Sequence, residues 1–242
     1  NQLWKDSNFV LGEPVSEIKY VCRNVDIIMA RLIKNETVEL FGKNATVPFI
    51  NGCDNSYHPC QILADALTIL EKFGTLDVNL MYIGAKNNVF NSHVEFFSKM
   101  KKGTLYGLTP LVNETACGPD FYEEAKKSGH YVELDPSMSM EEAKEYANKM
   151  DVLYTDTWVD MEFFNNPAYQ KQKEETLAKM MPYQLNGDFT KDSKAIVFHD
   201  MPMHVGFEIS QDVVDKNLDH ILDEAENRRH AEKAVMYTLL NS

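Results

Sequence analysis

The sequence lacks a hydrophobic run of the length that a transmembrane helix needs. None of its apolar stretches approaches the roughly 20 residues that span a bilayer. Residues 1–5 show neither the apolar core of a signal peptide nor a basic transit pattern. These two absences favour a cytoplasmic protein with no membrane partner.

Cysteine is scarce, and its spacing is not that of a metal site. Four cysteines lie far apart without CxxC spacing: Cys22, Cys53, Cys60 and Cys117. This pattern is typical of reduced thiols in the cytosol rather than of disulfides or zinc ligands. The 7 histidines form no HExxH pair either. We therefore expect no metal and no cofactor.

Positive charge is also in deficit. The chain has 24 Lys and Arg residues against 37 Asp and Glu residues, a formal net charge of −13, and it shows no basic stripe. This balance argues against nucleic acid as the main partner, because phosphate binding needs a basic face. Gly84 precedes two asparagines in the manner of a phosphate loop, but neither GxGxxG nor GxxxxGK[ST] follows. We therefore reject a nucleotide site.

The sequence does contain enough apolar residues for a full core, in a regular alternation of strand and helix patterns. Hydrophobic residues make up 44% of the 242, which allows one large domain or two modest ones. A first series predicts strands at 25–31 and 47–50 and helices at 13–23, 35–42 and 59–73. Gly74 ends the last of these helices, and we place a domain boundary there.

A second alternating series begins after Gly74. It predicts strands at 78–83, 104–108, 131–134, 152–155 and 195–198, with helices at 90–101, 120–127 and 139–150. Ser139 and Glu142 have the spacing of a capping box at the start of the last helix.

The last third of the chain is more polar. Residues 165–191 are rich in Gln, Lys and Glu and are interrupted by Pro167 and Pro182, which suits a mobile flap more than a core element. A charged run at 223–230 then precedes a final apolar helix that we expect at 231–240.

A cluster of polar residues at 53–65 lies between a predicted strand and a predicted helix. Pro59 suits the first turn of that helix, which puts His58 and Gln61 at its N-terminus. A His-Pro step in this position is more often a helix cap than a catalytic group. Polar residues at the ends of other predicted strands shift this balance toward a functional site.

Polar groups follow several predicted strands. Arg31 ends the first one, where it could bind an anion, although a surface arginine fits the pattern equally well. In the second series, polar side chains follow three strands, at Asn88, at 156–161 and at 199–202. We expect these to meet at one edge of the sheet, because ligands of open α/β sheets bind outside the carboxyl ends of strands.

Six ordered stretches resemble the ornithine/aspartate carbamoyltransferase superfamily, and its ornithine branch more closely than its aspartate branch. They are 26–31 (DIIMAR), 58–61 (HPCQ), 87–88 (NN), 156–159 (DTWV), His199 with Pro202, and 223–228 (DEAENR). The resemblance implies an α/β fold of two doubly wound parallel-sheet domains joined by helices. The expected divisions are a carbamoyl phosphate domain at 1–75, an ornithine domain at 76–215 and a C-terminal segment at 216–242 that returns to the first domain.

The resemblance also implies catalytic roles. In the family an amine attacks the carbamoyl carbon and phosphate leaves. Arg31, His58 and Arg228 would bind the carbamoyl oxygen and stabilise its developing charge. Gln61 would accept a hydrogen bond from the carbamoyl NH2 group, with help from backbone carbonyls near Met201.

The acceptor would be bound by residues of the second domain. Asn88 and Asp156 would bind its α-carboxylate and α-ammonium groups, since an amide donor and a carboxylate acceptor suit those two groups. Further expected contacts to the acceptor come from Asp160, Met161, His199, Asp200 and Met201.

The chain departs from the family at three places. The phosphate-binding Ser-x-Arg-Thr-Arg segment would fall upstream of Asn1, so we expect that the sequence shown omits an N-terminal part. The alternative is a truncated, inactive molecule, and the intact mass distinguishes the two. Asp160 and Asp200 stand where the ornithine branch has Ser and Cys, which leaves the acceptor's identity open. Residues 17–20 replace the usual Asp-Thr-Ala-Arg.

The function implied is transfer of a carbamoyl group from carbamoyl phosphate to the side-chain amine of ornithine, giving citrulline and phosphate, or the reverse in arginine breakdown. One alternative is a carbamoyltransferase for another amine or amide, such as putrescine. Another is a non-catalytic or regulatory paralogue. The resemblance also implies a homotrimer.

Overall fold

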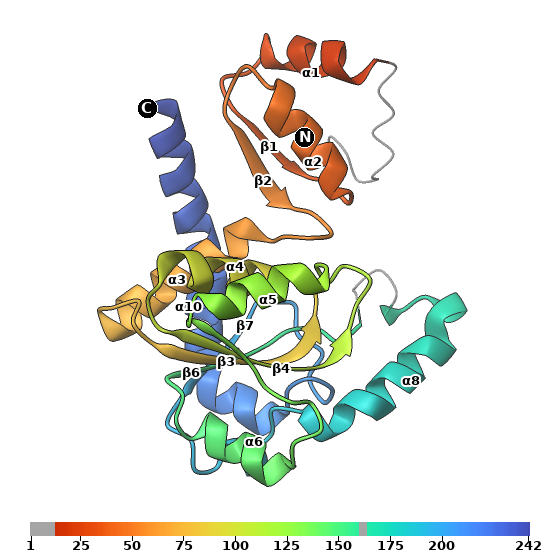
Figure 1. The fold of residues 1–242 in the computed structure, drawn as a ribbon, viewed down its shortest axis with the longest axis vertical. Coiled ribbons are helices and arrows are strands. Elements are labelled where there is room, and N and C mark those ends of the chain that lie inside the picture. Colours follow the sequence, from red (N-terminus) through yellow and green to blue (C-terminus); the bar gives the residue numbers. More distant parts are fainter. Residues whose placement is uncertain (1–12, 160–163) are drawn as a thin grey trace.

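The computed structural model describes residues 13–159 and 164–242, along which helices and strands alternate (Figure 1). The first elements are α1 (Pro14–Cys22), β1 (Ile28–Arg31), α2 (Asn35–Asn44), β2 (Phe49–Cys53) and α3 (Pro59–Phe73). Next come β3 (Asn79–Lys86), α4 (Asn88–Met100), β4 (Thr104–Val112), α5 (Pro119–Lys127), β5 (Tyr131–Glu133), α6 (Met140–Ala147) and β6 (Val152–Thr155). The last are η1 (Pro167–Tyr169), α8 (Gln170–Met180), η2 (Met181–Tyr183), α9 (Gly187–Thr190), β7 (Ile196–His199) and α10 (Gln211–Leu240). No helix in these described ranges combines the length and the apolar character needed to cross a membrane.

Strands β1 and β2 form a small parallel sheet of their own. Ile28 pairs with Phe49 at one end, and Arg31 pairs with Cys53 at the carboxyl end. Helices α1 and α2 cover this sheet around a small core of Ile18, Cys22, Leu32 and Phe41. In Figure 1 the lobe formed by α1, β1, α2 and β2 lies above the larger sheet, and the chain passes from β2 into α3.

Five parallel strands form the larger sheet, in the order β5-β4-β3-β6-β7. The chain starts at β3, moves outward through β4 to β5, and then returns to place β6 on the other side of β3. This reversal makes a topological switch point between β3 and β6, outside which doubly wound sheets bind their ligands. The predicted α/β fold with parallel sheets is confirmed.

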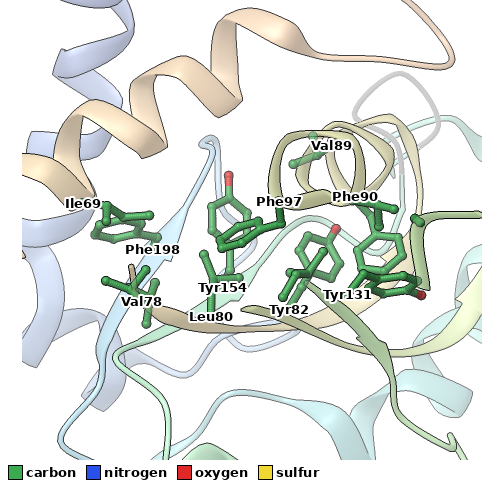
Figure 2. Packing of buried hydrophobic residues seen from close by; sticks show 14 of the residues in the cluster. Ile69, Val78, Leu80, Tyr82, Val89, Phe90, Phe97, Tyr131, Tyr154 and Phe198 are labelled. Carbon is green, nitrogen blue, oxygen red and sulfur yellow. The ribbon is translucent and has the colours of Figure 1, made fainter. Parts of the chain in front are cut away.

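Strand β3 is buried on both faces, as its continuous apolar sequence requires in a parallel sheet. Leu80 and Tyr82 face one core, which α3, α4 and α5 cover and which includes Tyr154 of β6 (Figure 2). Met81 and Ile83 face the opposite core, together with residues of α6, α9 and the first half of α10. Helices therefore cover both faces of the sheet.

The predicted elements of the two series are present, with shifts at their ends. The capping box of Ser139 and Glu142 begins α6. Gly74 ends α3 with φ +69°, a left-handed conformation that favours glycine. Strand β3 runs on to Lys86, past the predicted end at residue 83, so Gly84 lies within the strand.

Residues 165–191, for which we predicted a flap and not a core element, are helical and largely exposed. They fold into α8, α9 and two short 3-10 helices. Met180, Leu185 and Phe189 are buried, and these few apolar side chains attach the segment to the molecule. The many Gln, Lys and Glu residues lie on α8, which is largely exposed, so the polar composition reflects the surface of a helix.

Helix α10 is longer than predicted. It runs without a break from Gln211 to Leu240 and includes the charged run 223–230, in which neither proline nor glycine interrupts the helix. Part of that run is buried against α3: Asn227 Nδ2 donates a hydrogen bond to Thr68 Oγ1 at 3.0 Å. The polar residues thus form a helix contact, which an apolar periodicity cannot reveal.

Candidate active site

Asn87 and Asp156 flank the switch point of the larger sheet, because Asn87 follows β3 and Asp156 follows β6. Asn87 Nδ2 donates to Asp156 Oδ2 at 2.7 Å, while Asn87 Oδ1 accepts from the Phe90 N–H at 3.0 Å and caps α4. The Thr157 N–H donates to the other carboxylate oxygen at 2.6 Å. Asp156 is therefore buried and fixed where this fold places ligands.

The start of α4 also contacts the loop that follows β2. Asn88 Nδ2 donates to the Asp54 carbonyl oxygen at 2.8 Å and lies 3.3 Å from Cys53 Sγ. One turn later, Ser92 Oγ accepts from the His58 N–H at 2.7 Å. These contacts bring the carboxyl ends of β2 and β3 together.

His58 is a buried helix cap, and its second ring nitrogen makes no hydrogen bond within the described part of the chain. Its Nδ1 accepts from the Gln61 N–H at 3.3 Å, so the proton of a neutral ring sits on Nε2. Burial, followed by the charges of Arg228 and Arg31, lowers the pKa of His58 to about 4. The ring is therefore neutral near pH 7, with Nε2–H available as a donor.

Gln61 is fully buried at the first turn of α3. Its Nε2 donates to Asp65 Oδ1 at 2.8 Å and to Glu224 Oε1, and it lies 3.4 Å from the Tyr154 hydroxyl. Its Oε1 accepts from Arg228 Nη2. Acids lie on one side of the amide and a cation on the other, which fixes its orientation.

Arg228 connects α10 with the loop that follows β7. Besides contacting Gln61, its Nη2 donates to the Asp200 carbonyl oxygen at 2.7 Å. Arg31, by contrast, is exposed at the end of β1. Both arginines lie close enough to lower the pKa of His58, so the structure brings these three predicted catalytic residues into one region.

Asp200 lies beside Asp156, and both residues are buried. A side-chain hydrogen bond joins the two carboxyl groups. Burial, together with the charge of Asp156, raises the pKa of Asp200 well above its ordinary value. The Asp200 side chain therefore favours its neutral, protonated form.

His199 supports the loop on which Asp200 lies. Its Nδ1 accepts from the Met201 N–H at 3.0 Å, and its Nε2 contacts Glu208 Oε1 at 3.2 Å. The ring is fully buried and both of its nitrogens are engaged within the protein. This geometry favours a supporting role for His199 over a direct substrate contact. Met201 has φ +52°, a left-handed conformation.

The cysteines are free thiols, as predicted. Burial raises the pKa of Cys53, which lies next to the site, to about 11. It is therefore a neutral thiol. Within residues 13–159 and 164–242, no three His, Cys, Asp or Glu side chains are grouped so that they could hold a metal ion.

Two family models match this chain. Residues 5–71 match the carbamoyl-P binding domain of aspartate/ornithine carbamoyltransferase, and residues 76–239 match its Asp/Orn binding domain. The chain belongs to the aspartate/ornithine carbamoyltransferase family.

Individual members of the carbamoyltransferase family match over nearly the whole chain. The ornithine carbamoyltransferase of Archaeoglobus fulgidus is 33% identical over 244 residues, an alignment that covers 98% of this chain and 74% of that one. The enzyme of Pyrococcus horikoshii is 36% identical, with coverages of 95% and 70%. The solved ornithine carbamoyltransferase of Pyrococcus furiosus superposes with a TM-score of 0.80 at 33% identity, covering 96% of this chain and 72% of that one. For the structure from Thermus thermophilus the TM-score is 0.77 at 30% identity, with coverages of 95% and 72%.

The two carbamoyltransferase domains divide the predicted site residues between them. The carbamoyl-P binding match includes Arg31, His58 and Gln61. The Asp/Orn binding match includes Asn88, Asp156, His199, Asp200, Met201 and Arg228. Asp160 and Met161, also predicted to contact the acceptor, lie outside the described residues.

Four buried residues that contact or neighbour the predicted site residues were not predicted from the sequence: Asp65, Asn87, Ser92 and Glu224. Helical spacing is a signal that could have revealed two of them. Asp65 follows Gln61 by one turn on α3, and Glu224 precedes Arg228 by one turn on α10, so each shares a helix face with a predicted residue.

Proposed function

We propose that this protein transfers the carbamoyl group of carbamoyl phosphate to the side-chain amine of ornithine, giving citrulline and phosphate, or catalyses the reverse reaction. The observation that carries the proposal is His58, which is buried and neutral, senses the charges of both Arg31 and Arg228, and lies where contacts join the two family domains. The identity to ornithine carbamoyltransferases along nearly the whole chain supports ornithine as the acceptor.

Donors for the carbamoyl oxygen are the first requirement of this reaction. An amine that attacks the carbamoyl carbon pushes the C=O electrons onto oxygen, and the C–O bond to phosphate then breaks. His58 Nε2–H, Arg31 and Arg228 would stabilise that oxyanion, and such a donor typically contributes roughly 3 to 4 kcal/mol. A neutral imidazole suits the task because it donates without adding a buried charge.

Gln61 and nearby carbonyls would orient the carbamoyl NH2 group. Gln61 Oε1 accepts one hydrogen bond, from Arg228, and a carbonyl oxygen has a second lone pair to offer. The Asp200 carbonyl oxygen, next to Met201, already accepts from Arg228. Together these acceptors would fix the group in the orientation that attack requires.

The acceptor would lie against the Asp/Orn binding domain. Asp156 would bind the α-ammonium group and Asn88 the α-carboxylate, with Asp200 beside the attacking amine. The neutral form that burial favours for Asp200 explains how an acid can occupy a position where the ornithine branch has an uncharged thiol. Further contacts would come from Asp160, Met161 and Met201, while His199 would support the loop that carries Asp200.

A citrulline assay on the full-length protein tests this proposal. Ornithine and carbamoyl phosphate should give citrulline, and His58→Asn should lower kcat about 100-fold or more, because Asn still caps α3 but cannot replace the Nε2 donor. His230→Asn, on the exposed side of α10, is the matched control and should leave the kinetics unchanged. Turnover of putrescine without turnover of ornithine would move the assignment to a carbamoyltransferase with another acceptor.

We further propose a cytoplasmic homotrimer that acts in arginine metabolism. Free cysteine thiols support the compartment. The trimer is carried over from the family resemblance, and sedimentation that gave only monomer at micromolar concentration would refute it. We also propose the divisions 1–75, 76–215 and 216–242, although α10 already begins at Gln211.

A further inference from the structure

A buried contact joins α4 to α3 next to the candidate active site. His93 of α4 and Asp65 of α3 are fully buried, and His93 Nε2 lies 3.1 Å from Asp65 Oδ2. Neither atom has a hydrogen-bond partner elsewhere in the described part of the chain. The His93 ring packs in a T-shape against Tyr154, with centroids 4.5 Å apart. In Figure 2 the Tyr154 hydroxyl points away from the sheet, toward these helices.

The second nitrogen of His93 determines where the protons of this contact lie. His93 Nδ1 is 2.9 Å from the Val89 carbonyl oxygen, which can only accept, so Nδ1 carries a proton. If Nε2 carried none, its lone pair would face the oxygen of Asp65 and repel it. One proton therefore lies between His93 Nε2 and Asp65 Oδ2, and the pair is neutral as a unit.

From this pair, contacts lead into the site. Asp65 Oδ1 accepts from Gln61 Nε2 at 2.8 Å, and Gln61 Oε1 accepts from Arg228 Nη2. Arg228 donates in turn to the Asp200 carbonyl oxygen at 2.7 Å. His93 is thus connected to both Gln61 and Arg228 without being near the surface.

A second acid makes this arrangement sensitive to charge. Glu224 is fully buried and also accepts from Gln61 Nε2. Burial, together with the neighbouring Asp65, raises the pKa of Glu224 well above its ordinary value. Without His93, a charged Asp65 would keep Gln61 and Glu224 as hydrogen-bond partners, but it would have no positive group beside it to offset its buried charge, which is strongly unfavourable. Arg228 is the cation that it would then attract.

We propose that His93 is a positioning residue for carbamoyl transfer, an inference that rests on the proposed function. By sharing a proton with Asp65, it leaves that carboxyl group free to hold the Gln61 amide without attracting Arg228. Gln61 then keeps its nitrogen toward the acids and its oxygen toward the guanidinium group. Arg228 stays beside the Asp200 carbonyl, where the proposed reaction needs it.

The inference is tested by asking whether Asp65→Asn restores the activity that His93→Leu loses. His93→Leu removes the partner of Asp65, and we expect kcat/KM for carbamoyl phosphate to fall at least about tenfold. Asp65→Asn can donate through Nδ2 to the lone pair of His93 Nε2 and still accept from Gln61 through Oδ1, so it should stay within about threefold of the parent. The double variant has no buried charge at this position and should recover most of the activity that His93→Leu loses.

Phe97→Leu is the matched control, because it also removes ring volume from the buried face of α4. It should lower the melting temperature without changing kcat/KM. If His93 only filled space, Asp65→Asn would not rescue His93→Leu, and failure of that rescue would overturn the proposal. Parent-like kinetics of His93→Leu would overturn it as well.

A parent protein that forms no citrulline would count against the proposed function and not against the pair. The melting temperatures then decide the inference. His93→Leu should be less stable than Phe97→Leu, and Asp65→Asn should restore its stability. Equal losses in the two single variants, without restoration, would reject the shared proton.

Discussion

At the scale of single residues, His58 combines two tasks in one ring. Its Nδ1 caps α3, and this contact directs the ring proton to Nε2. Burial and two arginines keep the ring uncharged. The sequence presented cap and catalytic donor as alternatives, but the cap uses only Nδ1, so it is compatible with the donor role that we propose for Nε2–H.

The lowered pKa of His58 predicts a loss of stability in acid. The unfolded chain takes up this proton near pH 6.5 and the folded chain only near its pKa of about 4, so the folded state loses stability as the pH falls between these values. His58→Asn removes this contribution. Between pH 7 and pH 5 the parent should lose about 2 kcal/mol more than the variant in urea unfolding. Equal losses in the two proteins would show that the folded state does not depress the pKa.

Asp200 is predicted to govern the use of the acceptor. If its carboxyl group contacts the attacking amine, Asp200→Cys should change kcat/KM for ornithine by at least about tenfold. The KM for carbamoyl phosphate should stay nearly constant, because that substrate is assigned to other side chains and to the Asp200 backbone carbonyl, which the substitution keeps. Steady-state kinetics with each substrate varied in turn measure both effects. Unchanged kinetics toward ornithine would make Asp200 a spectator that merely pairs with Asp156.

At the scale of elements, prediction succeeded where apolar periodicity reports burial directly. Helix α3 was predicted over its whole length because its apolar face repeats and Gly74 ends it. The charged run 223–230 was missed as part of α10 because its buried residues are polar. Burial of Glu224 depends on Gln61, a partner distant in the sequence, and no local pattern encodes that contact.

Gly103, which precedes β4, and Gly129, which precedes β5, should differ in how well they tolerate substitution by alanine. Gly103 and Gly129 both have positive φ, +65° and +77°. A Cβ on Gly103 would lie 2.2 Å from the Val78 carbonyl oxygen, whereas one on Gly129 would meet nothing within 4 Å. Gly129→Ala should therefore cost about 1 to 2 kcal/mol for its backbone conformation alone. Gly103→Ala should cost about 3 kcal/mol or more in addition, because backbone must move. Urea unfolding of both variants measures the difference, and similar costs would contradict the clash.

At the scale of the whole molecule, the site depends on how the start of α4 braces the loop after β2. Asn88 and Ser92 bind that loop at the Asp54 carbonyl and the His58 N–H. Strand ends predicted only that Asn88 would lie with residues 156–161 and 199–202 at one edge of the sheet, and the family match places Asn88 and His58 in two different domains. The hydrogen bonds themselves could not be predicted, because each joins residues more than 30 positions apart.

Asn91 adds a further contact between α4 and the loop after β2, and its substitution tests whether these contacts hold the loop in place. Its Nδ2 donates to the Ser56 and Thr115 carbonyl oxygens at 2.8 and 2.9 Å, and its Oδ1 accepts from the Tyr122 hydroxyl at 2.6 Å. Asn91→Ala leaves these three groups without their partner, so we expect a loss of about 3 kcal/mol or more. The loop that carries His58 should also loosen, with faster hydrogen exchange at residues 54–58 and a lower kcat/KM.

A matched change at the half-buried Asn44 separates this effect from the loss of a single amide hydrogen bond. Asn44 Nδ2 makes one hydrogen bond, to the Leu40 carbonyl at 2.8 Å, and Asn44→Ala should cost less than about 1 kcal/mol. It should leave exchange in the loop unchanged. Equal stability losses in the two variants would mean that Asn91 is dispensable to the junction. Loss of stability at Asn91 without faster exchange at residues 54–58 would mean that the loop holds its shape without α4, and that the junction contributes to stability but not to the arrangement of the site.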